Sequence, residues 1–159
     1  MFFVGTPASL RYTVSMASDA PLPGALDALL GDVRLAALLE VLWLAASADG
    51  DVDEAELVQL TQSVQSLTEK RVAANEALAL FRSFASKPLP RLVRFGRLRE
   101  ELGARGLRLA ALDLAARVAA ADGIVRTSER EVLAELAEGL GLDRDDAANV
   151  IARASSQAT

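Results

Sequence analysis

Five carboxylates fall within eight consecutive positions, residues 49–56. They are Asp49, Asp51, Asp53, Glu54 and Glu56. Alternating acids supply ligands in the EF-hand calcium loop, which also needs glycine at its sixth position and a bidentate glutamate at its twelfth. Counted from Asp49, these two positions hold Glu54 and Leu60. The EF-hand is therefore excluded, and the acids need another explanation.

One explanation is that these acids begin a helix. Asp53 stands where an N-cap belongs, and Glu56 three residues later completes a capping box. The cap rule accounts for the type and the position of Asp53. It does not require an aspartate seven residues before Glu56. For Asp49 and Glu56 two roles therefore remain open, namely turn or cap formation and metal binding.

The pattern occurs a second time in the chain. VLWLAASADGDVDEAELVQL, residues 41–60, parallels LAARVAAADGIVRTSEREVL, residues 114–133. Both copies read Ala-Asp-Gly-x-Val-x-x-x-Glu, so Asp122 and Glu129 match Asp49 and Glu56. This duplication predicts two helical hairpins related by a pseudo-two-fold axis, with both Asp-Gly loops on one acidic surface. Glu129 lacks an acidic or hydroxyl N-cap at the matched position, unless its helix begins at Thr127 or Ser128 instead.

The composition defines the fold class and the chemistry. Ala and Leu, both strong helix formers, dominate a chain of 159 residues, which predicts an all-α domain of about seven helices. The chain has no Cys and no His, which excludes disulfides, thiol catalysis, the Ser-His pair and the usual zinc ligands. Any metal must then be a hard cation held by oxygen, such as calcium, magnesium or manganese.

Helix stop signals divide the sequence. A short helix is expected near residues 24–31, and an apolar one over 33–48 that ends at Asp49-Gly50. An amphipathic helix follows Asp53, and Thr68 is expected to cap another through about Ala85. A basic helix, RLVRFGRLREEL, follows the two prolines and ends near Gly103 and Gly106. Asp143, with Asp146 three residues on, is expected to cap the last helix.

The N-terminal residues do not fit a targeting signal. Residues 1–15 are apolar but lack a basic leading region and contain Arg11, so we expect a disordered extension, with translation starting at Met16. No apolar run reaches the length of a membrane span. We therefore expect one domain over residues 16–159 in a cytoplasmic protein.

Charge is distributed unevenly along the chain. The net charge is −5, yet ten of the 17 basic residues lie between residues 70 and 108. This two-sided distribution argues against nucleic-acid binding. Arg91, Arg94 and Arg97 recur at three-residue spacing. These arginines could contact phosphate, an acidic protein or the surface of a membrane. The alternative, which we favour, is a solvated face on which they pair with Glu100 and Glu101.

Two acids stand within apolar segments. Glu40 interrupts the first apolar helix, and Asp113 occupies the matching region of the second copy. We expect both on a solvent-facing edge. The alternative is burial beside a cation, for which Arg34 and Arg117 are candidates, because a lone buried carboxylate would neutralise.

The repeated motif resembles the TerB-like family, which includes tellurite-resistance proteins and the N-terminal region of DjlA co-chaperones. The similarity covers roughly residues 24–154, including both motif copies and the later LAEGLGLD. It implies an all-helical fold, metal binding at an acidic surface, a link to tellurite or stress resistance, and no enzyme activity. The metal ligands it suggests are Asp49, Glu56, Asp122 and Glu129. Ile124 and Arg126 replace Asp51 and Asp53 in the second copy, which weakens that loop.

Three functions are compatible with these observations. The first is a non-enzymatic module that binds a divalent cation and presents a surface to other proteins. The second is a protein-interaction domain in which the acidic motifs are structural. The third is a hydrolase with paired carboxylates, ranked last because the sequence shows no nucleophile constellation and no phosphate-cradling loop.

Overall fold

The computed structural model describes residues 32–47, 50, 52–87, 89–120 and 126–157. These residues form seven α-helices and no strand, which confirms the all-α prediction for this part of the chain. The helices are α3 (Asp32–Ala46), α4 (Glu54–Leu67), α5 (Ala74–Ala85), α6 (Arg91–Leu102), α7 (Arg105–Ala119), α8 (Thr127–Gly139) and α9 (Arg144–Gln157). The predicted helix near 24–31 and the predicted extension 1–15 lie outside the described residues.

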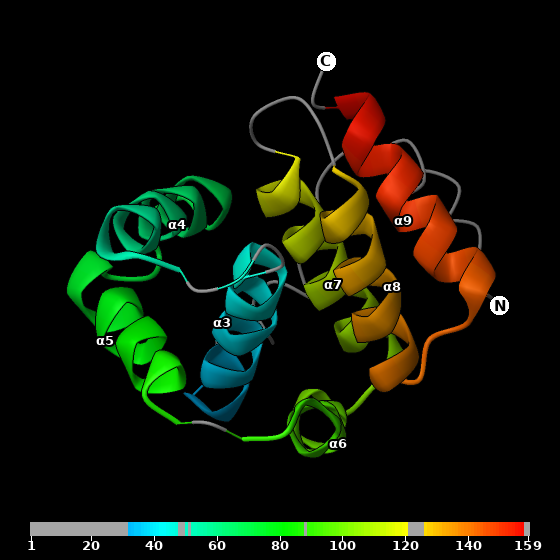
Figure 1. Ribbon diagram of the computed structural model, residues 1–159, viewed down its shortest axis with the longest axis horizontal. Coiled ribbons are helices and arrows are strands. Elements are labelled where there is room, and N and C mark those ends of the chain that lie inside the picture. Colours follow the sequence, from blue (N-terminus) through cyan, green and yellow to red (C-terminus); the bar gives the residue numbers. More distant parts are fainter. Residues whose placement is uncertain (1–31, 48–49, 51, 88, 121–125, 158–159) are drawn as a thin grey trace, which may run out of the picture.

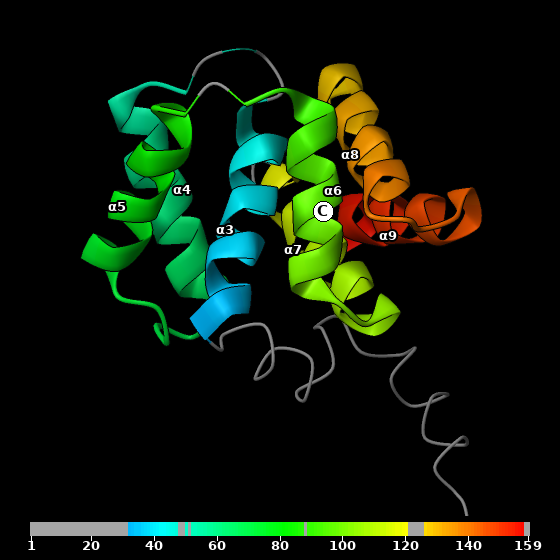
Figure 2. The same ribbon diagram turned by 90° about the horizontal axis from the view of Figure 1, so that it is seen from below.

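Helix α3 lies at the centre of the molecule (Figure 1). It packs against α5, α6, α7 and α8, and residues 37–42 are all buried. A helix that is apolar on every side needs neighbours on every side, which explains its place. Helices α4 and α5 flank it on one side and α7, α8 and α9 on the other, while α6 runs along one edge (Figures 1 and 2).

Helix α7 is also largely buried, and it packs extensively against α3. Its buried face carries many alanines, among them Ala111, Ala115 and Ala119. Small side chains allow the two helices to approach closely, so the alanine-rich composition has a direct structural use. The predicted pseudo-two-fold axis between the two hairpins stays a prediction.

Most helix ends follow the local signals. Gly50 has φ of +126° and donates its N–H to the carbonyl oxygen of Ser47 at 3.0 Å, which confirms the predicted turn. The second turn glycine, Gly123, lies outside the described residues. Asp143 accepts the N–H of Asp146 at 2.8 Å, which confirms the predicted cap of α9.

Thr68 was expected to begin a helix, and this prediction is wrong. Its hydroxyl donates to the Val64 carbonyl oxygen at 2.7 Å, and Thr68 closes α4. Glu69 and Lys70 then take positive φ values of 54° and 62°, which ends the helical path. The next helix starts only at Ala74. A threonine hydroxyl can accept a backbone N–H at the start of a helix or donate to a carbonyl oxygen at the end of one, so the sequence signal was ambiguous.

Candidate functional site

A cavity of about 230 Å³ opens between α4, α7 and α8, at the end of α3. Its lining comprises Ala46, Glu56, Gln59, Leu60, Ser63, Val118, Ala119 and Glu129. Two of the four predicted metal ligands, Glu56 and Glu129, therefore lie on one cavity although they belong to different copies of the motif. The other two, Asp49 and Asp122, lie outside the described residues.

Helix capping holds both glutamates in place. Glu56 Oε1 accepts the backbone N–H of Asp53 at 3.0 Å, and the Asp53 carboxylate accepts the N–H of Glu56 at 2.8 Å. This is the predicted capping box. Glu129 Oε1 accepts the N–H of Arg126 at 2.8 Å. The return bond is impossible there, because a guanidinium has no acceptor atom.

The cavity is smaller than most pockets that hold organic ligands. Ligand pockets commonly have volumes of about 300–1,000 Å³, whereas liquid water occupies about 30 Å³ per molecule. A volume of about 230 Å³ therefore accommodates a cation with several waters. Gln59 and Ser63 add neutral oxygens to the lining. Within the described ranges, no group of three or more His, Cys, Asp or Glu residues converges, and Asp49 and Asp122 lie outside those ranges.

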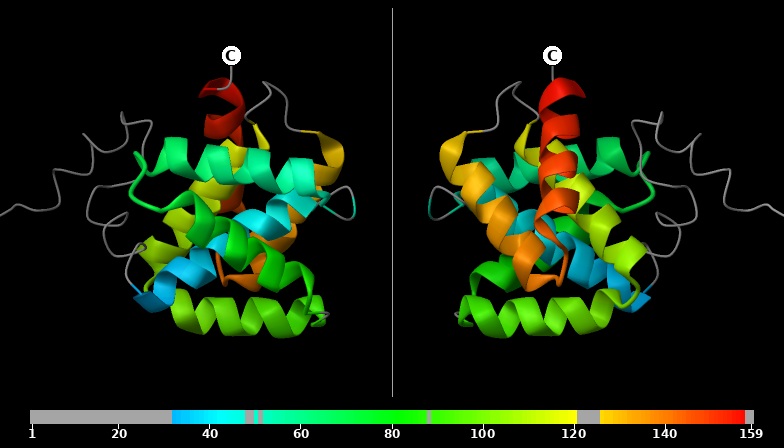
Figure 3. Two further views of the ribbon diagram at one scale, coloured as in Figure 1. Left: turned by 90° about the vertical axis from the view of Figure 1, so that its left-hand side faces the viewer. Right: turned by 90° about the vertical axis from the view of Figure 1, so that its right-hand side faces the viewer.

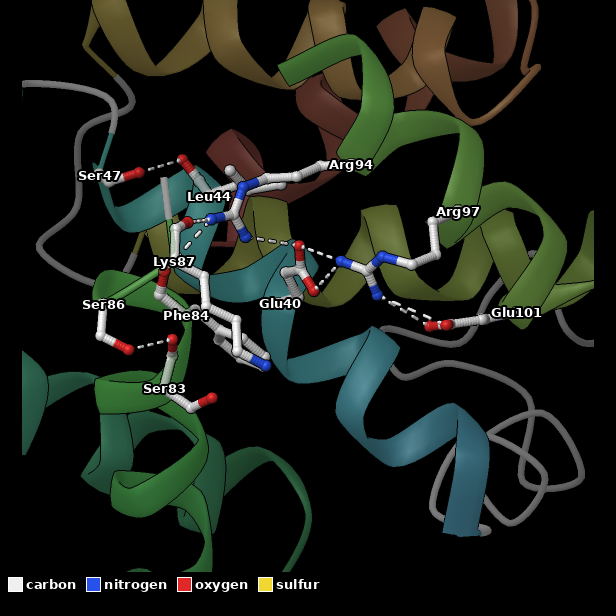
Figure 4. Close-up of polar contacts among 10 residues, drawn as sticks. All are labelled: Glu40, Leu44, Ser47, Ser83, Phe84, Ser86, Lys87, Arg94, Arg97 and Glu101. Atoms are coloured by element: carbon white, nitrogen blue, oxygen red, sulfur yellow. Dashed lines mark hydrogen bonds and ion pairs between the residues drawn. The ribbon is translucent and has the colours of Figure 1, made fainter. Parts of the chain in front are cut away.

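A buried polar network lies elsewhere in the described part of the chain, and sequence reasoning missed its partners (Figure 4). Glu40 is buried in α3 and accepts from Arg94 Nη1 at 2.7 Å and from Arg97 Nη2 at 2.7 and 2.8 Å. The expectation of a solvent-facing Glu40 is therefore wrong, and so is Arg34 as its partner. Arg34 Nε instead donates to the Leu102 carbonyl oxygen at 3.3 Å.

Arg94 is the centre of this network. It is buried, lies 5.2 Å from the centre of the Trp43 ring, and donates to the carbonyl oxygens of Phe84 and Lys87. A signal for this burial was present, because Arg94 precedes Leu98 and Leu102 by four and eight residues and so shares their apolar stripe.

The basic face predicted on α6 must be corrected accordingly. Arg94 cannot contact a membrane or a phosphate without leaving the core. Arg91 Nη1 contacts Glu135 at 2.9 Å, and Arg97 bridges Glu40 and Glu101. The expected pairing with Glu101 is thus present, but the predicted solvent-exposed basic face lacks Arg94, which is buried.

Asp113 is also buried, contrary to the solvent-edge expectation. Arg117 Nε donates to its Oδ2 at 3.1 Å, so Arg117 is the predicted partner. Arg153 Nη2 lies 3.7 Å from Oδ1, which accepts no hydrogen bond within the described structure. Burial raises the pKa of Asp113 above its ordinary value, and the two arginines oppose this only in part. Asp113 therefore bonds within α7 through Arg117 and forms an ion pair with Arg153 of α9.

No protein-family model, no curated protein and no solved structure matches this chain. The similarity to the TerB-like family therefore depends on the two motif copies and the later LAEGLGLD segment. No helix in the described ranges has the length and apolar character that crossing a membrane requires.

Proposed function

We propose that this chain is a non-enzymatic, TerB-like binding module that holds a hard divalent cation between its two repeated motifs. The observation that carries the proposal is the shared cavity of Glu56 and Glu129. These glutamates occupy the same position in the two copies, and two distant segments supply them. A pseudo-two-fold arrangement of the hairpins accounts for this convergence.

The proposed ligands are Asp49, Glu56, Asp122 and Glu129. The capping bonds engage Oε1 of each glutamate. A carboxylate has two oxygens and about four lone-pair sites, so a capping role and a ligand role are compatible. When bound, the cation supplies positive charge that offsets repulsion among the carboxylates. With a weakened second loop, we expect an affinity of about 10⁻⁴ M, at the weak end of oxygen-ligand sites.

The wider role follows from the family resemblance. TerB-like proteins are linked to tellurite or stress resistance, and we extend that link to a cytoplasmic module that presents its surface to other proteins. The alternative is an interaction domain without a metal. It is favoured by the capping bonds, because they already give Glu56 and Glu129 a structural purpose.

Thermal melts with millimolar calcium, magnesium or manganese distinguish the metal-binding module from the interaction domain without a metal. The test variant carries Asp49→Asn and Asp122→Asn, which leaves both capping glutamates intact. The matched control carries Glu76→Gln and Glu100→Gln, two exposed acids away from the cavity, and loses the same charge.

Because a native-state ligand stabilises by mass action, a cation should raise the Tm of the wild type and of the control but not that of the test variant. If no cation raises the wild-type Tm, or if the test variant responds equally, the acids are structural and the chain has no cation site of this kind.

A further inference from the structure

A second, larger concavity lies between α8 and α9, with a volume of about 860 Å³. The apolar part of its lining comprises Ala134, Ala137, Leu142, Ala147, Ala148 and Ile151. Around these lie Glu131, Glu135, Glu138 and Asp143, against a single cation, Arg144. We call this surface the α8–α9 groove. It shares no residue with the cavity of Glu56 and Glu129, and its surroundings are acidic.

An apolar projection flanked by basic residues lies at the start of α6. Four large apolar side chains are exposed among the described residues, and three of them lie within five positions. They are Leu89, Leu92 and Val93, exposed by 42%, 82% and 54%, and we call them the Leu92 patch. Lys87 and Arg91 flank it with positive charge. Single exposed apolar residues need no explanation, whereas a cluster commonly marks an interaction site.

The Leu92 patch and the α8–α9 groove border one another. Arg91, adjacent to Leu92 in α6, contacts Glu135 of the groove at 2.9 Å. Further along the same two helices, Phe95 packs directly against Gly139. Helices α8 and α9 lie on one face of the molecule with α6 along its edge (Figure 3, right). The start of α6, with its apolar projection beside cations, therefore adjoins an apolar recess beside carboxylates.

We propose that the α8–α9 groove receives the Leu92 patch of a second copy of this chain, and that two such contacts form a two-fold dimer. The two surfaces match in polarity and are opposite in charge, so association removes apolar surface from water and places basic residues beside acidic ones. A two-fold interface uses both surfaces of each molecule at once, and here the two surfaces adjoin through α6 and α8.

Sedimentation velocity over a series of concentrations tests the dimer. The average mass of the wild type should rise from 16.8 kDa towards twice that value. Leu92→Glu in the patch and Ala148→Glu in the groove, both at exposed positions, should each leave a monomer with an unchanged helical circular-dichroism spectrum. Val58→Glu is the matched control, because Val58 is the remaining exposed large apolar residue and lies on α4. It should still dimerise.

Mixing the two interface variants gives the sharpest test. Leu92→Glu keeps an intact groove and Ala148→Glu keeps an intact patch, so the mixture can form one of the two contacts. A heterodimer should appear in the mixture although neither variant associates alone. A wild type that stays monomeric at every concentration overturns the proposal. It does so even if the groove binds an added basic amphipathic peptide, because that result would indicate another partner and not a second copy of the chain. A mass that continues to rise beyond two copies overturns the two-fold arrangement.

Discussion

Arg94 Nη1 donates to Glu40 Oε2 at 2.7 Å, and the two side chains are only 6% and 2% exposed. This ion pair joins α6 to α3 inside the core, while the same guanidinium donates to carbonyl oxygens at the end of α5 and just beyond it. The buried pair therefore joins three helices, although neither residue lies in the repeated motif.

Removing one member of this pair should be costly. Glu40→Leu leaves Arg94 buried without its carboxylate, and breaking a buried pair costs about 3–5 kcal/mol of unfolding free energy. Urea denaturation measures this. The double variant Glu40→Leu with Arg94→Met should lose much less than the sum of the two single losses, because no buried charge then lacks its partner. Strict additivity would contradict the coupling.

Two glycines on neighbouring helices should respond to alanine in opposite directions. A Cβ at Gly139 would lie 2.5 Å from Cγ of Phe95, a buried ring that cannot easily move, so Gly139→Ala should cost about 1–3 kcal/mol. At Gly96, inside α6, a Cβ meets nothing within 4 Å, so Gly96→Ala should stabilise by about 0.5–1 kcal/mol. Equal effects by urea denaturation would refute the packing difference.

The cap of α4 can be tested at Asp53 without removing a glutamate of the cavity. Asp53→Ala should lower the free energy of unfolding by about 1 kcal/mol, because the N–H of Glu56 loses its acceptor. Asp53→Asn retains an acceptor and should be nearly neutral. If both substitutions destabilise equally in chemical denaturation, the negative charge matters more than the cap.

Asp113 should give stability a characteristic pH dependence. Burial raises the pKa of its carboxyl in the folded chain, so the folded state binds the proton more tightly than the unfolded state. Unfolding free energy should therefore rise as the pH falls from above the folded pKa towards the ordinary value of the unfolded chain.

The control for this titration is Asp113→Asn, which cannot titrate. The difference between wild type and variant, measured by urea denaturation from about pH 3 to 7, isolates this carboxyl. A wild type that loses stability relative to the variant as the pH falls would show that Arg117 and Arg153 outweigh burial.

The sequence alone determined the helices and most of their ends. The capping box at Asp53, the cap at Asp143 and the turn at Gly50 each involve groups within three or four residues, so the local pattern contains all the partners. The exception is Thr68, whose hydroxyl serves the end of one helix as readily as the start of another.

Only the tertiary structure decided which distant residues meet. The sequence offers several arginines as possible partners of Glu40. Arg94 and Arg97 are its partners because α6 packs against α3 beside Glu40. The convergence of Glu56 and Glu129 on one cavity likewise depends on how α4, α7 and α8 pack. Helix periodicity identifies a buried face, but the crossing of two helices decides which side chain on each face lies opposite the other.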